Sequence, residues 1–155
     1  MNHGEEAARL FMEGYNCSQA VFLAFRDLTG FEPETAARLA SSFGAGMGRM
    51  REVCGGVSGM FMVAGLLYGY DSPTDLESKK EHYARIQELA AAFKEKRGSI
   101  ICREILRNPS TDPAPSPRTA EYYAKRPCAR MVHDAAAVLD AYILEHPIPG
   151  RETEA

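Results

Sequence analysis

The sequence predicts an all-α protein, a single-domain bundle of about six to seven helices. Apolar residues recur at helical spacing along almost the whole chain, and no segment alternates apolar and polar residues as a strand does. Glycine, proline and capping residues stand between the apolar periods. The chain has 155 residues, 45% of them hydrophobic, which is enough for one core. We therefore expect one domain over residues 1–155, with residues 148–155 as a frayed tail.

Four helices are expected in the first half of the chain. The first spans residues 5–13 and is followed by a glycine. Asn16 is a preferred N-cap and starts the second helix, which continues to about Thr29. The third covers residues 31–43, with proline and acidic residues at its start. The fourth covers residues 52–68 and is predicted to be the buried centre of the bundle.

This fourth helix is rich in glycine. Gly55 and Gly59 lie four residues apart, and therefore on one helix face, where a neighbouring backbone can approach closely. Residues 53–70 carry no formal charge over 18 residues, which is the lower limit for a transmembrane helix. Because charged residues flank the segment and the other helices are amphipathic, we expect a buried core helix and no membrane span.

The second half begins with a long, highly charged helix to about Lys96, entered through Ser72-Pro73-Thr74-Asp75. A short helix over residues 100–106 follows. Residues 108–117 contain four prolines and are expected to form an extended surface loop, because each proline fixes its own φ. Residues 119–125 form a turn or a short helix. Pro127 stands at a preferred helix start, so the last long helix is expected to run from Cys128 to about Glu145.

Composition excludes several classes of function. The formal net charge is −3, so a nucleic-acid-binding surface is not expected. The N-terminal residues lack the basic and apolar regions of a secretory signal, which predicts a cytoplasmic protein. In that reducing compartment, permanent disulfides are not expected.

Four cysteines are the candidate functional residues: Cys17, Cys54, Cys102 and Cys128. Each falls at or just inside the start of a predicted helix. A helix N-terminus carries free N–H groups and the positive end of the helix dipole, so it is expected to lower a thiol pKa from its free value near ~8.5. The glycines after Cys54 are expected to let these helix starts converge. Cys17 and Cys54 are predicted to be the more reactive pair, with Cys102 and Cys128 as their partners.

The segments around the first two cysteines carry a family resemblance. They read GYNCSQAV at residues 14–21, FGAGMGR at residues 43–49 and EVCGGVSG at residues 52–59. This chain resembles the C-GCAxxG-C-C family, whose members are described as redox-active four-cysteine proteins. Gly56 stands where the family cluster has alanine. The resemblance implies that the four cysteines are the functional residues, and it supplies no substrate.

Three uses of four such cysteines remain open. The first is thiol–disulfide exchange or electron relay, which needs no cofactor and would make the protein a thiol-dependent oxidoreductase acting on an unidentified thiol, disulfide or electron-transfer partner. The second is ligation of zinc or of an iron–sulfur cluster. Spacings of 37, 48 and 26 residues, with no Cys-x-x-Cys pair, favour the first over the second. The third is a structural role, in which the cysteines are small buried hydrophobes of a non-catalytic interaction protein.

Two features close to Cys54 in the sequence are candidate parts of a site. The glycine-rich segment at residues 44–48 follows a helix and lacks the Gly-Lys-Ser/Thr ending, so a turn between helices is favoured over a phosphate loop. Arg49 and Arg51 precede Cys54 closely, and either could lie beside its sulfur and favour the thiolate.

Overall fold

A computed structural model describes residues 2–151 of the chain. Within these residues the structure is helical and contains no strand, so the all-α prediction is confirmed. Six of the helices are eight residues long or longer. The elements are α1 (His3–Met12), α2 (Cys17–Ala24), α3 (Arg26–Thr29), α4 (Pro33–Ala40), the 3-10 helix η1 (Ser41–Phe43), α5 (Gly44–Met47), α6 (Gly55–Tyr68), α7 (Leu76–Arg97), α8 (Cys102–Leu106), α9 (Ala120–Lys125) and α10 (Cys128–Glu145).

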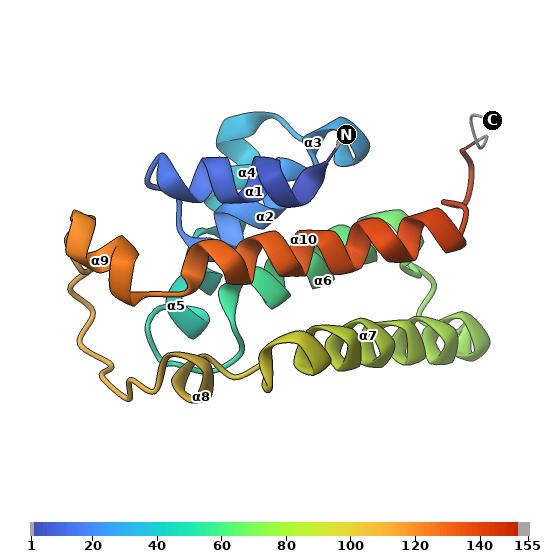
Figure 1. Cartoon of the computed structure of the whole chain (residues 1–155). Coiled ribbons are helices and arrows are strands. Elements are labelled where there is room, and N and C mark those ends of the chain that lie inside the picture. The colour runs from blue at the N-terminus through green and yellow to red at the C-terminus, as the bar shows by residue number, and fades with distance from the viewer. Residues whose placement is uncertain (1, 152–155) are drawn as a thin grey trace.

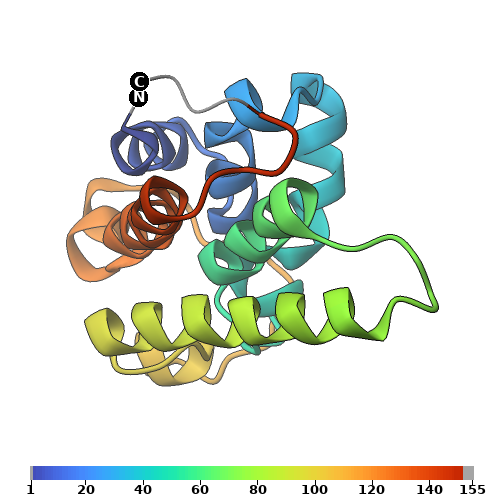
Figure 2. The same ribbon diagram turned by 90° about the vertical axis from the view of Figure 1, so that its right-hand side faces the viewer.

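The long helices pack around α6. Helices α1 and α10 lie side by side along one side of the bundle, and α7 crosses beneath α6 and α10 (Figures 1 and 2). Helix α2 lies against both α6 and α10. Most of the α6 side chains are buried, including Val57, Met60, Val63 and Ala64. The predicted glycine-rich buried helix is therefore at the centre of the core.

The helix boundaries follow the capping residues in the sequence. The Asn16 side chain accepts a hydrogen bond from the Gln19 N–H, and the Gln19 side chain accepts one from the Asn16 N–H, forming a capping box at the start of α2. Asp75 caps α7 by accepting from the Ser78 N–H. Gly98 ends α7 in the left-handed conformation. Local signals of this kind fix where most of the helices begin and end.

The central helix begins three residues later than predicted. Residues 51–54 are not helical, because they pair with residues 100–103 around an isolated antiparallel bridge between Val53 and Ile101. The Cys54 N–H donates to the Ile100 carbonyl oxygen at 2.7 Å. This pairing is long-range, so helical periodicity in the sequence gave no sign of it.

The close approach predicted from Gly55 and Gly59 is present. A Cβ at Gly59 would lie 2.8 Å from the Ser18 carbonyl oxygen, and one at Gly55 would overlap the Cys17 sulfur. The first turn of α2 therefore packs directly on the glycine face of α6. This contact places Cys17 beside the start of α6, where Cys54 lies.

The chain after α10 is packed in its described part. Ile148 is half-buried against the core, and the Arg151 side chain donates a hydrogen bond to the Leu28 carbonyl oxygen. These contacts place Ile148 and Arg151 against the bundle, and fraying of residues 148–155 stays a prediction. Residues 152–155 lie outside the described residues.

Among residues 2–151, no helix combines the length and the apolar character that crossing a bilayer requires. The segment at residues 53–70, which raised the question, forms α6 and its flanks in the core.

Candidate functional site: a pocket lined by four cysteines

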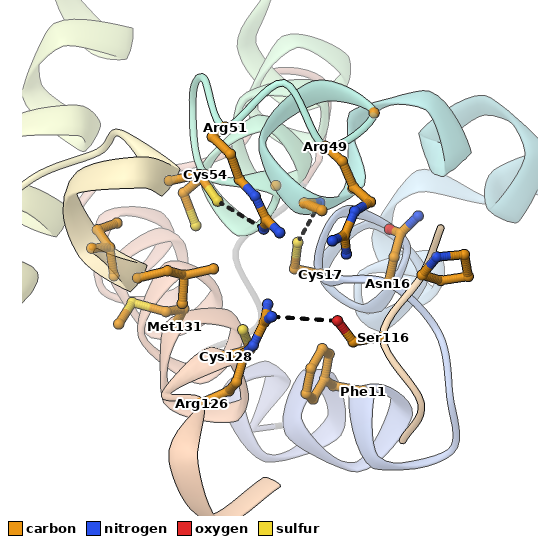
Figure 3. A pocket seen from close by; sticks show the side chains of 18 of the residues that line it. Phe11, Asn16, Cys17, Arg49, Arg51, Cys54, Ser116, Arg126, Cys128 and Met131 are labelled. Carbon is orange, nitrogen blue, oxygen red and sulfur yellow. Dashed lines mark hydrogen bonds between the residues drawn. The ribbon is translucent and has the colours of Figure 1, made fainter. Parts of the chain in front are cut away.

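All four cysteines line one pocket, although they are far apart in the sequence. The cavity has a volume of about 290 Å³ and lies where the starts of α2, α6, α8 and α10 meet. Figure 3 shows Cys17 and Cys128 facing this space from different helices, with Cys54 on a third. All four are free thiols. The predicted convergence of the cysteines is therefore observed in the structure.

The four cysteines stand at helix starts, as predicted. Cys17, Cys102 and Cys128 are the first residues of α2, α8 and α10. Cys54 is the N-cap residue of α6 and so stands just outside the helix, because residues 51–54 pair with residues 100–103. The Cys17 sulfur accepts a hydrogen bond from the Ala45 N–H at 3.4 Å. Free N–H groups thus reach the sulfur of at least one of these thiols.

Two backbone contacts bring the cysteines together. The packing of α2 on Gly55 sets Cys17 beside Cys54, as described above. The bridge between residues 51–54 and 100–103 brings Cys102 to the same place, because the Cys102 N–H donates to the Glu52 carbonyl oxygen at 2.6 Å. Cys17 and Cys102 each interact electrostatically with all of the other three thiols.

The expectation that helix starts lower the thiol pKa values is wrong for three of the cysteines. Burial raises the pKa of Cys17, although the Ala45 N–H opposes the shift. Burial likewise raises the pKa of Cys54, with Cys17 adding to the shift. For Cys128, burial and the nearby Cys17 raise the pKa to about 11. Loss of water around these sulfurs therefore outweighs the free N–H groups.

Four arginines share the pocket with the thiols: Arg49, Arg51, Arg118 and Arg126. The sequence allows Arg49 or Arg51 to lie beside Cys54; in the structure the Arg51 Nη1 lies 3.8 Å from the Cys102 sulfur and donates to it. Its Nε donates to the Ser110 carbonyl oxygen at 2.9 Å. Arg51 is only 1% exposed, and it is the largest fully buried side chain among the described residues. The structure thus puts a positive charge against Cys102.

A left-handed stretch of backbone carries the first two of these arginines. Ala45, Met47 and Arg49 have φ values of 55°, 65° and 68°, and Arg51 has a φ of 60°. A residue with a side chain pays about 1–2 kcal/mol to adopt this conformation. Helix α5 is the first turn of this stretch and is not an ordinary α-helix, because Ala45 and Gly46 have positive φ within it. The predicted turn between helices is present here, and it holds the two arginines over the pocket.

Sequence reasoning missed the far wall of the pocket. Arg118, Tyr122 and Arg126 line it together with Pro113, Pro115 and Ser116 of the proline-rich loop. Arg126 stands two residues before Cys128, a proximity that could have suggested it. Arg118 had no such local signal. Its guanidinium stacks 4.2 Å from the Phe11 ring centroid and donates to the Phe11 carbonyl oxygen, a contact between residues far apart in the chain.

The described residues contain no group of three or more histidine, cysteine, aspartate or glutamate side chains arranged to hold a metal ion. The four sulfurs surround the pocket without forming such a group.

The fold and the site together define an all-α protein whose four cysteines line one arginine-containing pocket. Residues 15–142 match the family described as "Putative redox-active protein (C_GCAxxG_C_C)". The match covers most of the chain, and the protein belongs to this family. No curated protein and no solved structure matches the chain.

Proposed function

We propose that the protein is a dithiol oxidoreductase that reduces a small disulfide through its pocket cysteines. One observation carries the proposal: thiols from four separate helix starts line one pocket of about 290 Å³. Packing alone does not require buried cysteines to share a cavity. Membership of a family described as redox-active also supports a redox role for these cysteines.

Cys102 is the proposed attacking thiol. Its sulfur accepts a hydrogen bond from the buried Arg51 guanidinium. A positive charge at a sulfur stabilises the negative charge that the nucleophilic thiolate carries. Cys102 also lines the pocket, so a small disulfide bound there can reach it. This assignment departs from the prediction that Cys17 and Cys54 are the more reactive pair, which no observation has tested.

Cys17 is the proposed resolving thiol. Negative charge on Cys102 raises the pKa of Cys17, after the larger effect of burial. While Cys102 is a thiolate, Cys17 therefore keeps its proton. Once Cys102 has formed a mixed disulfide its charge is gone, and Cys17 ionises more readily.

The exchange balances as two substitutions at sulfur. The Cys102 thiolate attacks one sulfur of the disulfide, breaks its S–S bond and releases the first thiolate. Cys17 then loses its proton and attacks Cys102, forming an intramolecular disulfide and releasing the second thiolate. The protein dithiol is oxidised by two electrons, and the small disulfide is reduced to two thiols after protonation. Cys54 and Cys128 line the same pocket and take no part in these two substitutions.

Disulfide mapping tests this proposal. Reduced protein is treated anaerobically with 2-hydroxyethyl disulfide, blocked with N-ethylmaleimide and digested for mass spectrometry. We expect a disulfide between Cys17 and Cys102. Cys17→Ser should accumulate the mixed disulfide at Cys102, and Cys102→Ser should form neither species. Four unmodified thiols in the folded wild-type protein would refute the proposal.

The metal alternative is tested on the same preparation. Protein purified anaerobically is analysed for zinc, iron and sulfide, and its absorption spectrum is recorded. A stoichiometric metal or cluster that is lost when the cysteines are replaced by serine would assign the thiols to ligation. In that case the exchange described above would not be their primary role.

A further inference from the structure

The pocket holds a positive charge whose hydrogen-bonding capacity is not fully used. The Nη2 atom of Arg51 is buried and has no hydrogen-bond partner within residues 2–151. Its other nitrogens reach the Ser110 carbonyl oxygen and the Cys102 sulfur, neither of which is a carboxylate. Burying a charged group without a full set of partners is costly. A guanidinium in this state, on the wall of a cavity, is suited to receive an anion.

Two further arginines direct positive charge to the same space. Figure 3 shows Arg49 and Arg51 reaching into the pocket side by side from one wall, and Arg126 reaching in from the opposite wall. Burial lowers the pKa of Arg49, and the charges of Arg51 and Arg126 lower it further. The Arg49 guanidinium is therefore close enough to both Arg51 and Arg126 to be repelled by each of them. An anion between them would relieve this repulsion.

Carboxylates do not neutralise this group. In the described part of the chain, the pocket lining includes no aspartate or glutamate, and no carboxylate forms an ion pair with these three arginines. The Asp112 charge raises the pKa of Arg49, against the larger lowering by burial, Arg51 and Arg126, and the Asp112 side chain accepts from the Ala114 N–H. Arg49 itself contacts the Asp112 backbone carbonyl oxygen.

Arg118, which lines the same pocket, has a structural role because its hydrogen bonds are made within the fold. Its Nη1 donates to the Phe11 carbonyl oxygen and its Nη2 to the Tyr15 carbonyl oxygen, each at 3.0 Å. Its face also stacks on Phe11 and Tyr122. Arg118 therefore holds α1 against α9 and has little capacity left for a ligand.

The size and the walls of the cavity indicate a small organic anion. A volume of about 290 Å³ is at the lower end of the range for small-molecule sites. Apolar side chains, among them Phe11, Leu106 and Met131, line the remainder of the space. A protein disulfide would not fit within such a cavity, whereas a molecule with a short apolar body and an oxyanion group would.

We propose that the pocket binds a small organic anion through Arg51, Arg49 and Arg126, so that the disulfide it reduces carries an oxyanion group such as a carboxylate. The binding step stands on the arginines alone. The identity of the bound molecule as a redox substrate rests on the proposed function. Guanidinium groups form paired hydrogen bonds with carboxylate and phosphate oxygens, which gives this preference its chemical basis.

Calorimetric titration tests the binding step without any redox chemistry. The probe is 3,3′-thiodipropionate, a dianionic thioether that cannot exchange with thiols, and its neutral counterpart is 2,2′-thiodiethanol. We expect the dianion to bind and the diol not to bind. Arg49→Gln and Arg126→Gln should each weaken binding of the dianion by about tenfold or more, since each removes charge-assisted hydrogen bonds. Arg38→Gln, at an exposed position on α4 outside the pocket, is the matched control and should bind normally.

Exchange kinetics then separate the two proposals. Reduced protein is mixed with dianionic 3,3′-dithiodipropionate, neutral 2-hydroxyethyl disulfide and dicationic cystamine. We expect the dianion to react fastest relative to its rate with a free thiol, and Arg126→Gln to reduce that advantage. Binding without exchange would retain the anion site and refute the redox function. Exchange with all three disulfides, without selective binding of the dianion, would retain the redox function and overturn the anion site.

Discussion

Two of the buried basic side chains, His3 and Arg51, have opposite kinds of partners. His3, at the start of α1, is 5% exposed and lies between two carboxylates. Its Nδ1 is 2.6 Å from Asp140 and its Nε2 is 3.0 Å from Asp27, while its ring stacks on Phe25. Arg51, at 1% exposure, meets a carbonyl oxygen and a sulfur and leaves one nitrogen unpaired.

The difference separates a structural charge from a functional one. His3 is paired within the fold, and the pairing ties α1 to α3 and α10. Such a group needs nothing from outside the chain. Arg51 lacks that compensation and lies on the wall of a cavity with the four thiols. Its charge is therefore available to a reacting sulfur and to an anionic ligand.

The largest expected effect concerns the contact that forms the pocket. Gly55→Ala should destabilise the fold by about 3 kcal/mol, because the added methyl group would overlap the Cys17 sulfur and press on the Phe43 carbonyl oxygen. Gly65→Ala, in the same helix with open space around it, should stabilise the fold by about 0.5–1 kcal/mol. Urea unfolding followed by circular dichroism measures both. Equal effects at the two glycines would show that α2 does not approach α6 as described.

The pH dependence of Cys128 alkylation reports how far water is excluded from the Cys128 sulfur. Because burial and Cys17 raise the pKa of Cys128 to about 11, its thiolate fraction should grow about tenfold per pH unit below that value. Alkylation of Cys128 by iodoacetamide should therefore accelerate about a hundredfold between pH 8 and pH 10. Peptide mapping of short reaction times gives the rate at this cysteine. A rate that levels off near pH 8.5 would mean that water reaches the sulfur freely.

Substitution of His3 and of Arg51 shows how much each side chain contributes to the stability of the fold. His3→Ala leaves Asp27 and Asp140 facing each other without a cation, and should cost about 2 kcal/mol. Arg51→Met removes a charge that is not compensated, so stability should stay unchanged or rise by up to about 1 kcal/mol. Unfolding in urea gives both values. If Arg51→Met were as destabilising as His3→Ala, the two charges would both be structural.

The smallest effect is the pH dependence of the His3 site. Burial lowers the pKa of His3, but its hydrogen bonds to Asp140 and Asp27 outweigh burial and leave the pKa raised above 6.5. A raised pKa in the folded state stabilises the protein fully below pH 6.5, and this contribution is lost as the pH rises through the folded value. The stability difference between wild type and His3→Gln should therefore shrink from pH 6 to pH 9. A constant difference would show that His3 does not gain a proton on folding.

The elements that sequence predicted well are those set by local signals. Asn16, Asp75 and Gly98 mark helix ends by capping chemistry, and Gly55 and Gly59 reveal a close-packed face through their spacing. The same logic placed the four cysteines at helix starts. These inferences needed no knowledge of distant contacts.

The electrostatics of the site depended on contacts that local patterns do not contain. The pairing of residues 51–54 with residues 100–103 places Arg51 beside Cys102, and this pairing is long-range. The left-handed backbone near Arg49 has no characteristic spacing of apolar residues that would reveal it in the sequence. Burial of the thiols reversed the pKa shift expected for Cys17 from its position in the first turn. Desolvation is a property of the whole fold, so neighbouring residues could not predict it.

Titration with phenylarsine oxide measures whether the thiols lie together in the folded protein. This reagent bonds two sulfurs only when they can approach one another. We expect the reduced, folded protein to take up arsenic with the loss of two or four free thiols, and Cys17 to be among the thiols protected in peptide mapping. If the folded protein takes up no arsenic, while all four thiols are free to react with a monofunctional reagent once it is unfolded, the four cysteines do not share a pocket.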